Sequence, residues 1–277
     1  MAAPLLEAKL RVPTRRSGAV DRPRLLARLA AGRDGALTLV SAPAGFGKST
    51  LLAEWLATED RPIAWVSIDP ADDDPARFWT YVLAAVARAA PEAAAAVSLL
   101  EAGPSPIEPI LTTLVNDLEA GDDGVVVVLD DHHLVTSPEI HEGVEFLVEH
   151  LPPQVQLVLA TRSDPPLPLA RLRARGELVE VRAGDLRFTA DEAAAYLNHT
   201  MGLALTVGDV EALESRTEGW IAALQLAALS LQGRDDVAGF ISEFAGDDRF
   251  VVDYLVEEVL QRQPEQVRSF LLQTSVL

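Results

Sequence analysis

Two hydrophobic patterns alternate along the chain up to about residue 188. Runs of consecutive apolar residues are typical of strands buried on both faces, whereas apolar residues three or four positions apart are typical of helices. The runs predict strands at 36–42, 62–69, 124–131, 155–166 (with a loop at its end) and 178–181. The helical spacing predicts helices at 48–57, 75–90, 106–121 and 138–150. This alternation predicts a three-layer α/β fold with a mainly parallel, five-stranded sheet.

Beyond residue 188 only the helical pattern continues. TADE at 189–192 and TVGD at 206–209 fit the capping box, in which a hydroxyl and a carboxylate three positions apart begin a helix. Helices are expected at 191–199, 207–217, 219–232, 237–245, 248–262 and 264–275. We therefore expect an N-terminal arm and helix at 1–36, an α/β domain at 37–188 and a helical lid subdomain at 189–277. Because the final run FLLQTSVL lacks a polar tail, we expect the sequence to be cut from a longer protein, within the start of a further domain.

Composition narrows the class of protein. The 277 residues carry a formal charge of −19, so a nucleic-acid-binding face is not expected here. There is no cysteine, which excludes disulfides and thiolate chemistry. No apolar run reaches the roughly eighteen residues of a membrane span, and the N-terminus does not fit a secretory signal. A cytoplasmic protein without membrane contact is expected.

A glycine-rich loop, APAGFGKST at 42–50, follows the first predicted strand directly. It matches the phosphate-binding pattern G-x(4)-G-K-[ST] except at Ala42, where a small side chain leaving the strand is tolerable. In such loops the glycines let the backbone N–H groups approach phosphates, Lys48 contacts the outer phosphates, and Ser49 ligates magnesium. Only one other lysine, Lys9, occurs in the chain. The alternative is a coincidental glycine-rich turn.

Acidic residues end the third predicted strand in LDDHH at 129–133. P-loop NTPases place an acid there near magnesium, which fits Asp130, and Asp131 is then the candidate to orient an attacking water. The alternative is that both acids cap the next helix. The following pair, His132 and His133, is expected to be structural, because neighbours on a strand face opposite ways and no third metal ligand is suitably spaced.

Arg162 follows the fourth predicted strand and is a candidate sensor of the γ-phosphate; the alternative is a pairing with Asp164 or with another acid of this acidic surface. The acidic run at 72–74 is expected to act in helix capping and as solvated charge, with Asp74 as N-cap before Pro75. The arginines of 170–176 are expected on a helix surface.

Several stretches together resemble the nucleotide-binding module of STAND-class signal-transduction NTPases, in the branch found in MalT-like, LuxR-type transcriptional regulators. They are KLRVPTRRSGAVDRPRLLARL, SAPAGFGKSTLLAEW, WVSIDPADDDPARFW, VVVVLDDHHLV, ATRSDPPLPLARLRARGEL, DLRFTADEA and TEGWIAALQLAALSL. The resemblance implies an ASCE-type P-loop NTPase fold and a loop that often lacks its first glycine. It places Val20 and Arg22 of the arm beside the adenine and ribose. In GWI at 219–221, Ile221 stands where the family has the proline of G-x-P.

The expected site therefore combines three groups of residues. Catalytic roles fall to Lys48, Asp131 and Arg162, and magnesium to Ser49 and Asp130. Nucleotide binding falls to Val20, Arg22, Pro43, Ala44, Gly45, Phe46, Gly47, Lys48, Ser49, Thr50, Trp220 and Ile221.

The leading functional hypothesis is an ATP/ADP switch with weak Mg²⁺-dependent ATPase activity, within a larger transcriptional regulator that self-associates in its ATP state. The resemblance implies that an inducer-binding sensor, a winged helix and a DNA-binding domain lie outside these residues. The alternatives are a small-molecule kinase or other phosphotransferase, and a nucleotide-binding scaffold without hydrolysis.

Overall fold

The computed structural model describes residues 4–14, 18–103, 106–121, 124–234, 236–244, 249–261, 265 and 267–268. The chain forms two compact units, which are described separately. The first comprises Met1–Arg16, Arg22–Pro43 and Lys48–Asp185. The second comprises Ser17–Asp21, Ala44–Gly47 and Leu186–Leu277, so it includes the tip of the glycine-rich loop. The predicted boundaries at 36 and 188 stay a prediction.

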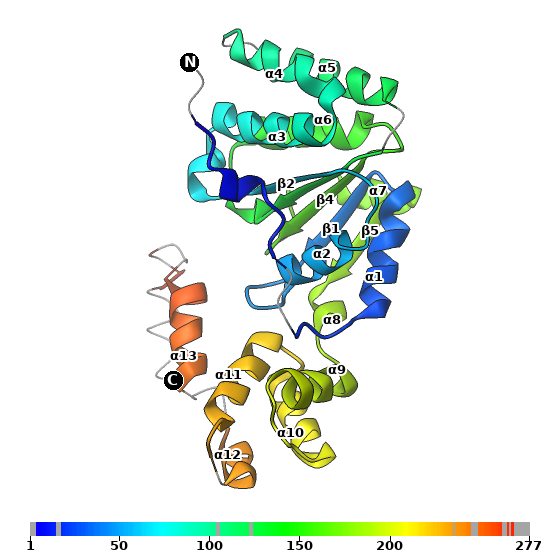
Figure 1. The fold of residues 1–277 in the computed structure, drawn as a ribbon. Coiled ribbons are helices and arrows are strands. Elements are labelled where there is room, and N and C mark those ends of the chain that lie inside the picture. The colour runs from blue at the N-terminus through cyan, green and yellow to red at the C-terminus, as the bar shows by residue number, and fades with distance from the viewer. Residues whose placement is uncertain are drawn as a thin grey trace. The chain divides into compact units, whose positions relative to one another are not determined.

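A parallel sheet forms the centre of the first unit (Figure 1). Its strands are β1 (Leu37–Ser41), β2 (Ile63–Ser67), β3 (Val126–Asp130), β4 (Gln156–Thr161) and β5 (Leu178–Arg182). They pair in the order β2-β3-β4-β1-β5. Every residue of β1, β3 and β4 is buried, because these inner strands are covered on both faces. The predicted five-stranded α/β fold is confirmed.

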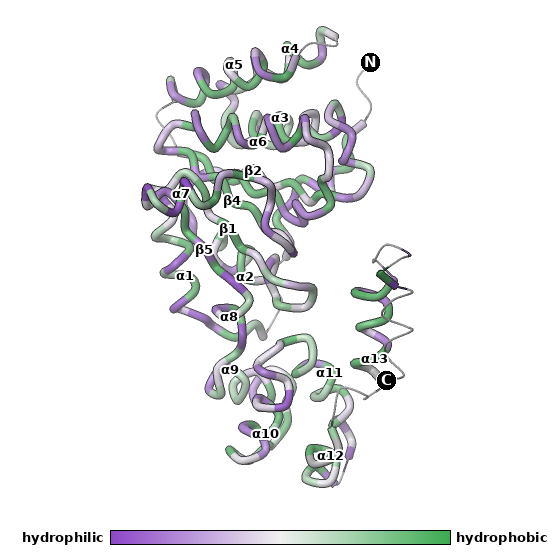
Figure 2. Tube along the Cα trace, turned by 180° about the vertical axis from the view of Figure 1, so that it is seen from behind, coloured by the Kyte–Doolittle hydropathy of each residue, from purple (hydrophilic) through white to green (hydrophobic). Residues whose placement is uncertain are grey.

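Helices cover both faces of this sheet, with α3 and α6 on one side and α1 and α2 on the other (Figure 1). The α-helices of this part of the chain are α1 (Pro23–Ala30), α2 (Lys48–Leu56), α3 (Pro75–Ala89), α4 (Ala94–Glu101), α5 (Ile107–Ala120), α6 (Pro138–His150), α7 (Leu169–Arg175) and α8 (Ala183–Leu186). Short 3-10 turns include η1 (Glu7–Leu10), η3 (Pro70–Asp73) and η5 (His132–Leu134). Figure 2 shows hydrophobic residues along the strands and a mixture of hydrophobic and hydrophilic residues along α3, α5 and α6.

Each aspartate of the acidic run 72–74 has a different partner. Asp74 caps α3 by accepting a hydrogen bond from the Arg77 amide, at 2.9 Å, as predicted. Asp72 is instead 1% exposed and pairs with Lys9 and with Arg77. Asp73 accepts from the amides of Thr136 and Ser137, at 2.6 and 2.8 Å, and so fixes the segment that follows β3. The expectation of solvated charge was therefore wrong for Asp72 and incomplete for Asp73.

The described part of the second unit is helical and contains no strand. Its elements are α9 (Ala190–Ala194), the π-helix η6 (Ala195–Thr200), α10 (Val207–Thr217), α11 (Ile221–Leu231), α12 (Val237–Glu243), α13 (Arg249–Leu255) and the π-helix η7 (Val256–Leu260). Both predicted capping boxes are present, Thr189 with Glu192 and Thr206 with Asp209. The predicted helix 264–275 lies almost wholly outside the described residues. No described helix is both long and apolar enough to cross a bilayer.

One glycine of the first unit is required by close packing. Gly143 lies in α6 against the ring of Trp79, which is 1% exposed. A Cβ added at Gly143 would overlap that ring. Because the ring is enclosed by the core, it cannot move aside without disturbing its other neighbours.

We expect Gly143→Ala to destabilise the fold by about 1–3 kcal/mol, because overpacking outweighs the roughly 1 kcal/mol by which alanine favours a helix. Urea unfolding at constant pH measures this change. Gly184→Ala is the matched control, since Gly184 lies in α8 with no atom within 4 Å of an added Cβ. A Gly143→Ala variant as stable as the control would contradict this packing argument.

Candidate functional site

The glycine-rich loop joins the carboxyl end of β1 to the start of α2. Gly45 and Gly47 have φ values of +75° and +76°, which side-chain-bearing residues rarely adopt. Ala42 needs no such freedom. It is buried, and its amide donates to the Thr161 carbonyl at 3.2 Å, which extends the β1–β4 ladder by one bond. This placement explains why alanine suffices where the common pattern has glycine.

Lys48 begins α2 and is buried. Its amine donates to the carbonyls of Ala42 and Pro43, at 2.8 and 3.1 Å. Burial lowers the pKa of Lys48, while Asp131 and Asp130 act to raise it and Arg162 to lower it. The lysine therefore lies within electrostatic reach of all three predicted partners, and the ammonium is held in place by the loop's own backbone.

Asp130, the last residue of β3, is a buried carboxylate with one oxygen engaged. Its Oδ2 accepts from the Ser49 hydroxyl at 2.8 Å. Within the described part of the chain, its Oδ1 has no hydrogen-bond partner. Burial, followed by the nearby Asp131, raises the pKa of Asp130 to about 6. An unpaired buried oxygen raises the free energy of the folded protein. A cation bound to this carboxylate would remove that cost.

The donor set around Asp130 fits magnesium better than a metal caged by protein. No group of three or more histidine, cysteine or acidic side chains suitable for a metal occurs among the residues that the structure describes. Magnesium commonly takes one or two protein oxygens and fills its other positions with water and phosphate. Ser49 and Asp130 would supply these two oxygens.

Asp131 turns the chain sharply away from β3. Its φ and ψ of 60° and 35° are left-handed, a conformation that is uncommon outside glycine and that accumulates at functional sites. Its side chain is 44% exposed, and its Oδ1 lies 3.7 Å from Nδ1 of His133. His132, the next residue, is buried. It is 1% exposed, its ring lies 5.5 Å from that of His141, and burial lowers its pKa to about 3. The burial of His132 is compatible with the structural role expected for the two histidines, which stays a prediction.

Arg162 follows β4, whose final residue, Thr161, is in register with Ser41 at the end of β1. The alternative to its sensor role is a pairing with Asp164 or with another acid, and both interpretations stay predictions. In the structure Asp164 pairs with Arg182 and accepts from the Ser41 hydroxyl at 3.4 Å. Sequence reasoning missed the pair of Asp164 and Arg182, because these residues lie 18 positions apart and no local pattern joins them.

The arginines of α7 lie on the surface, as expected. Arg171 pairs with Glu149, Arg173 pairs with Glu180 at 2.8 Å, and Arg175 lies 3.9 Å from a carboxylate oxygen of Glu177.

The other residues that were predicted to bind nucleotide differ in burial and position. Arg22 is buried and precedes α1, whereas Pro43 is exposed, and Ser49 and Thr50 lie in the first turn of α2. Val20 packs against the hydrophobic core of the second unit. Their roles stay predictions.

Within the second unit, the start of α11 holds the loop tip. The Trp220 indole donates to the Ala44 carbonyl, and the Ala222 amide donates to the Gly45 carbonyl, both at 3.2 Å. The rings of Phe46 and Trp220 lie 6.4 Å apart. Ile221, at the position of the family's proline, is the first residue of α11, a position where proline is also well tolerated.

Curated relatives match nearly the whole chain, although no family model matches it. The serine/threonine-protein kinase PknK of Mycobacterium tuberculosis is 38% identical over 270 residues, which cover 96% of this chain and 24% of PknK. The HTH-type transcriptional regulator MalT of Yersinia enterocolitica is 36% identical over 278 residues, which cover 99% of this chain and 31% of MalT. The chain thus spans less than a third of the length of these relatives.

Solved structures show the same fold at low sequence identity. A STAND protein with a tetratricopeptide-repeat sensor from Pyrococcus horikoshii has a TM-score of 0.56 and 15% identity, covering 96% of this chain and 36% of that one. A Walker-type ATPase of Pyrococcus abyssi has a TM-score of 0.57 and 18% identity, covering 93% and 80%. From its curated relatives and its fold together, the chain belongs to the MalT-like STAND modules and has the P-loop NTPase fold.

Proposed function

We propose that the chain is an ATP/ADP-binding switch module that hydrolyses ATP slowly and controls self-association of a larger, signal-responsive transcriptional regulator. The observation that carries the proposal is the contact of Ser49 with the buried Asp130 carboxylate, next to Lys48. A hydroxyl, a carboxylate with one unengaged oxygen and a buried ammonium form a donor set for a nucleotide triphosphate with its magnesium.

In this proposal each residue of the site has a separate role in nucleotide binding or hydrolysis. The loop amides and Lys48 bind phosphate oxygens, and Ser49 and Asp130 hold magnesium. Bound magnesium neutralises phosphate charge. Asp131 accepts a hydrogen bond from the attacking water and orients it, and Arg162 contacts the γ-phosphate. Val20 and Arg22 contact the adenine and ribose, and Trp220 and Ile221 also take part in nucleotide binding.

Regulation, rather than metabolic turnover, fits the pattern of relatives. PknK is named a protein kinase and MalT a transcriptional regulator, yet both contain a segment similar to this chain. A segment shared by proteins with different named activities serves a task common to both. Switching by a nucleotide could be that task. Ligand contacts that are present in one conformational state and absent in the other shift the equilibrium between the two states. Contacts of Lys48 and Arg162 with the γ-phosphate would distinguish ATP from ADP.

Replacing Lys48 with alanine should weaken ATP and ADP binding at least 100-fold, because the phosphates lose their buried counter-charge. Isothermal titration of nucleotide-free protein measures both affinities. Arg33→Ala removes a positive charge from an exposed side chain and should leave both affinities within twofold. Undiminished affinity in Lys48→Ala, with the fold intact by circular dichroism, would refute the phosphate-binding role.

Asp131→Asn should slow ATP hydrolysis at least tenfold and leave ATP affinity unchanged, since it removes the charge that orients water. Asparagine is preferred over alanine here because it tolerates the left-handed backbone of this position. Phosphate release under single-turnover conditions measures the rate, with the exposed Asp60→Asn as control. If turnover does not change, Asp131 has no part in catalysis.

Without nucleotide, the Asp130 carboxylate should destabilise the fold above pH 6. In the folded state its pKa of about 6 lies above the ordinary aspartate value of 3.8, so the folded state binds more protons between these values and loses stability as pH rises through them. A rise in pKa from 3.8 to about 6 corresponds to roughly 3 kcal/mol. Asp130→Asn should therefore stabilise the nucleotide-free protein by up to that amount at pH 7.5, and by less at pH 5.

Urea unfolding of wild type and Asp130→Asn at both pH values tests this expectation, with Asp60→Asn as the exposed control. A gain in stability that is equal at pH 5 and pH 7.5 would show that ionisation of Asp130 is not its cause.

A further inference from the structure

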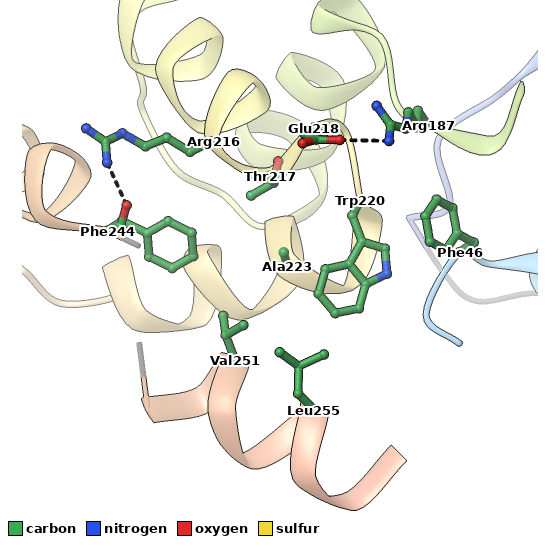
Figure 3. A pocket seen from close by; sticks show the side chains of 10 residues that line it. All are labelled: Phe46, Arg187, Arg216, Thr217, Glu218, Trp220, Ala223, Phe244, Val251 and Leu255. Carbon is green, nitrogen blue, oxygen red and sulfur yellow. Dashed lines mark hydrogen bonds and ion pairs between the residues drawn. The ribbon is translucent and has the colours of Figure 1, made fainter. Parts of the chain in front are cut away.

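Asp73 holds a segment next to the candidate site, although it is not among the residues predicted for that site. In this it differs from the hollow of about 350 Å³ in the helical unit (Figure 3), whose lining includes Phe46 and Trp220, two residues predicted to bind nucleotide. Asp73 is the last residue of η3, which follows β2, and it belongs to the first unit together with β3 and α6.

The Asp73 carboxylate accepts three hydrogen bonds from the segment that follows β3. Its Oδ1 accepts from the amides of Thr136 and Ser137, at 2.6 and 2.8 Å, and its Oδ2 accepts from the Thr136 hydroxyl. Burial acts to raise the pKa of Asp73, but these hydrogen bonds lower it, and the resulting pKa lies below the ordinary aspartate value. The group is therefore ionised at neutral pH, and hydrogen bonds to an ionised acceptor are among the stronger ones in proteins.

The segment held by Asp73 begins at Asp131. Asp131 leaves β3 with φ and ψ of 60° and 35°, and such a left-handed conformation persists only where the surrounding structure fixes it. Before this turn, the Asp130 carbonyl accepts from the Ile68 amide, at 3.0 Å. After it, η5 leads to the two amides that are bonded to Asp73. The chain is thus fastened on both sides of Asp131 to residues that follow β2.

The start of α6 has no capping bond of its own to replace this contact. Ser137 is the N-cap residue of α6, but its side chain makes no capping hydrogen bond with any residue that the structure describes. The next residue is Pro138, which has no N–H group. The acceptor for the backbone at this point is therefore supplied by Asp73, from another loop.

The direction of the Asp131 side chain depends on this backbone. The side chain is 44% exposed, and its Oδ1 lies 3.7 Å from Nδ1 of His133, which is too far for a strong hydrogen bond. A group that orients a water must lie within about 3 Å of it, and a displacement of about 1 Å can slow a reaction about 100-fold.

We propose that Asp73 is a positioning residue for ATP hydrolysis: by holding Thr136 and Ser137, it keeps the turn after β3 in the conformation in which Asp131 orients the attacking water. The inference rests on the catalytic role proposed above for Asp131. Asp73 touches neither nucleotide nor water in this role, so its loss lowers the rate of hydrolysis and not the affinity for ATP. A residue that only stabilised the start of α6 would not change the rate in the folded protein.

Asp73→Ala should slow single-turnover ATP hydrolysis at least tenfold and leave ATP affinity within twofold of wild type. Asp74→Ala is the matched control, because it removes the neighbouring carboxylate and its cap on the Arg77 amide, but not the contact with Thr136 and Ser137. It should change the rate less than twofold. Equal rates in the two variants, both folded by circular dichroism, would overturn the proposal.

Asp73→Asn keeps one oxygen for the two amides but loses the ionised group. It should hydrolyse ATP at least threefold more slowly than wild type and faster than Asp73→Ala. This conservative variant provides the test if Asp73→Ala does not fold, and a wild-type rate in Asp73→Asn would then overturn the positioning role.

A double variant tests whether Asp73 acts through Asp131. Asp73→Ala combined with Asp131→Asn should hydrolyse ATP within twofold of the rate of Asp131→Asn alone, whereas rate losses that multiply would overturn the proposal. If Asp131→Asn slows hydrolysis and Asp73→Ala does not, the positioning role alone fails. If Asp131→Asn has the rate of wild type, the catalytic role of Asp131 fails, and the positioning role fails with it.

Discussion

The contact between the Ser49 hydroxyl and the buried Asp130 carboxylate is the interaction on which the candidate site depends. It joins the first turn of α2 to the end of β3, and so connects the glycine-rich loop with the strand-end acids. A fully buried strand can end in a carboxylate only if another group compensates its charge. One hydroxyl does so in part, which is why the pKa of Asp130 stays raised. The negative charge of Asp130 is thus only partly compensated in the protein without ligand. This lowers the stability of the fold but favours binding of a cation.

A second constraint acts on the loop itself. Gly45 and Gly47 are left-handed, and a Cβ on Gly45 would come within 2.7 Å of Ala222 and of the Tyr254 hydroxyl. Glycine is therefore needed at position 45 for its backbone and also for the close approach of the second unit's side chains. The loop tip is grouped with the helical unit, whereas Lys48 and Ser49 are grouped with the sheet.

Local signals in the sequence predicted most of the fold. Runs such as 124–131 identify strands because they are apolar throughout, and both capping boxes identify helix starts because their partners lie three residues apart. The cluster of Lys48, Ser49 and Asp130 could be predicted because carboxyl ends of parallel strands meet at one edge of a sheet. The pairs of Asp73 with Thr136 and of Asp164 with Arg182 could not, because they join residues far apart in sequence.

The most direct test of the central claim is to denature the purified protein and identify the nucleotide that is released. A nucleotide-operated switch at rest should release ADP in an amount close to one per chain. An empty protein that also fails to bind added ATP or ADP in the presence of magnesium would contradict the account, and the glycine-rich loop would then be a turn with no phosphate to hold.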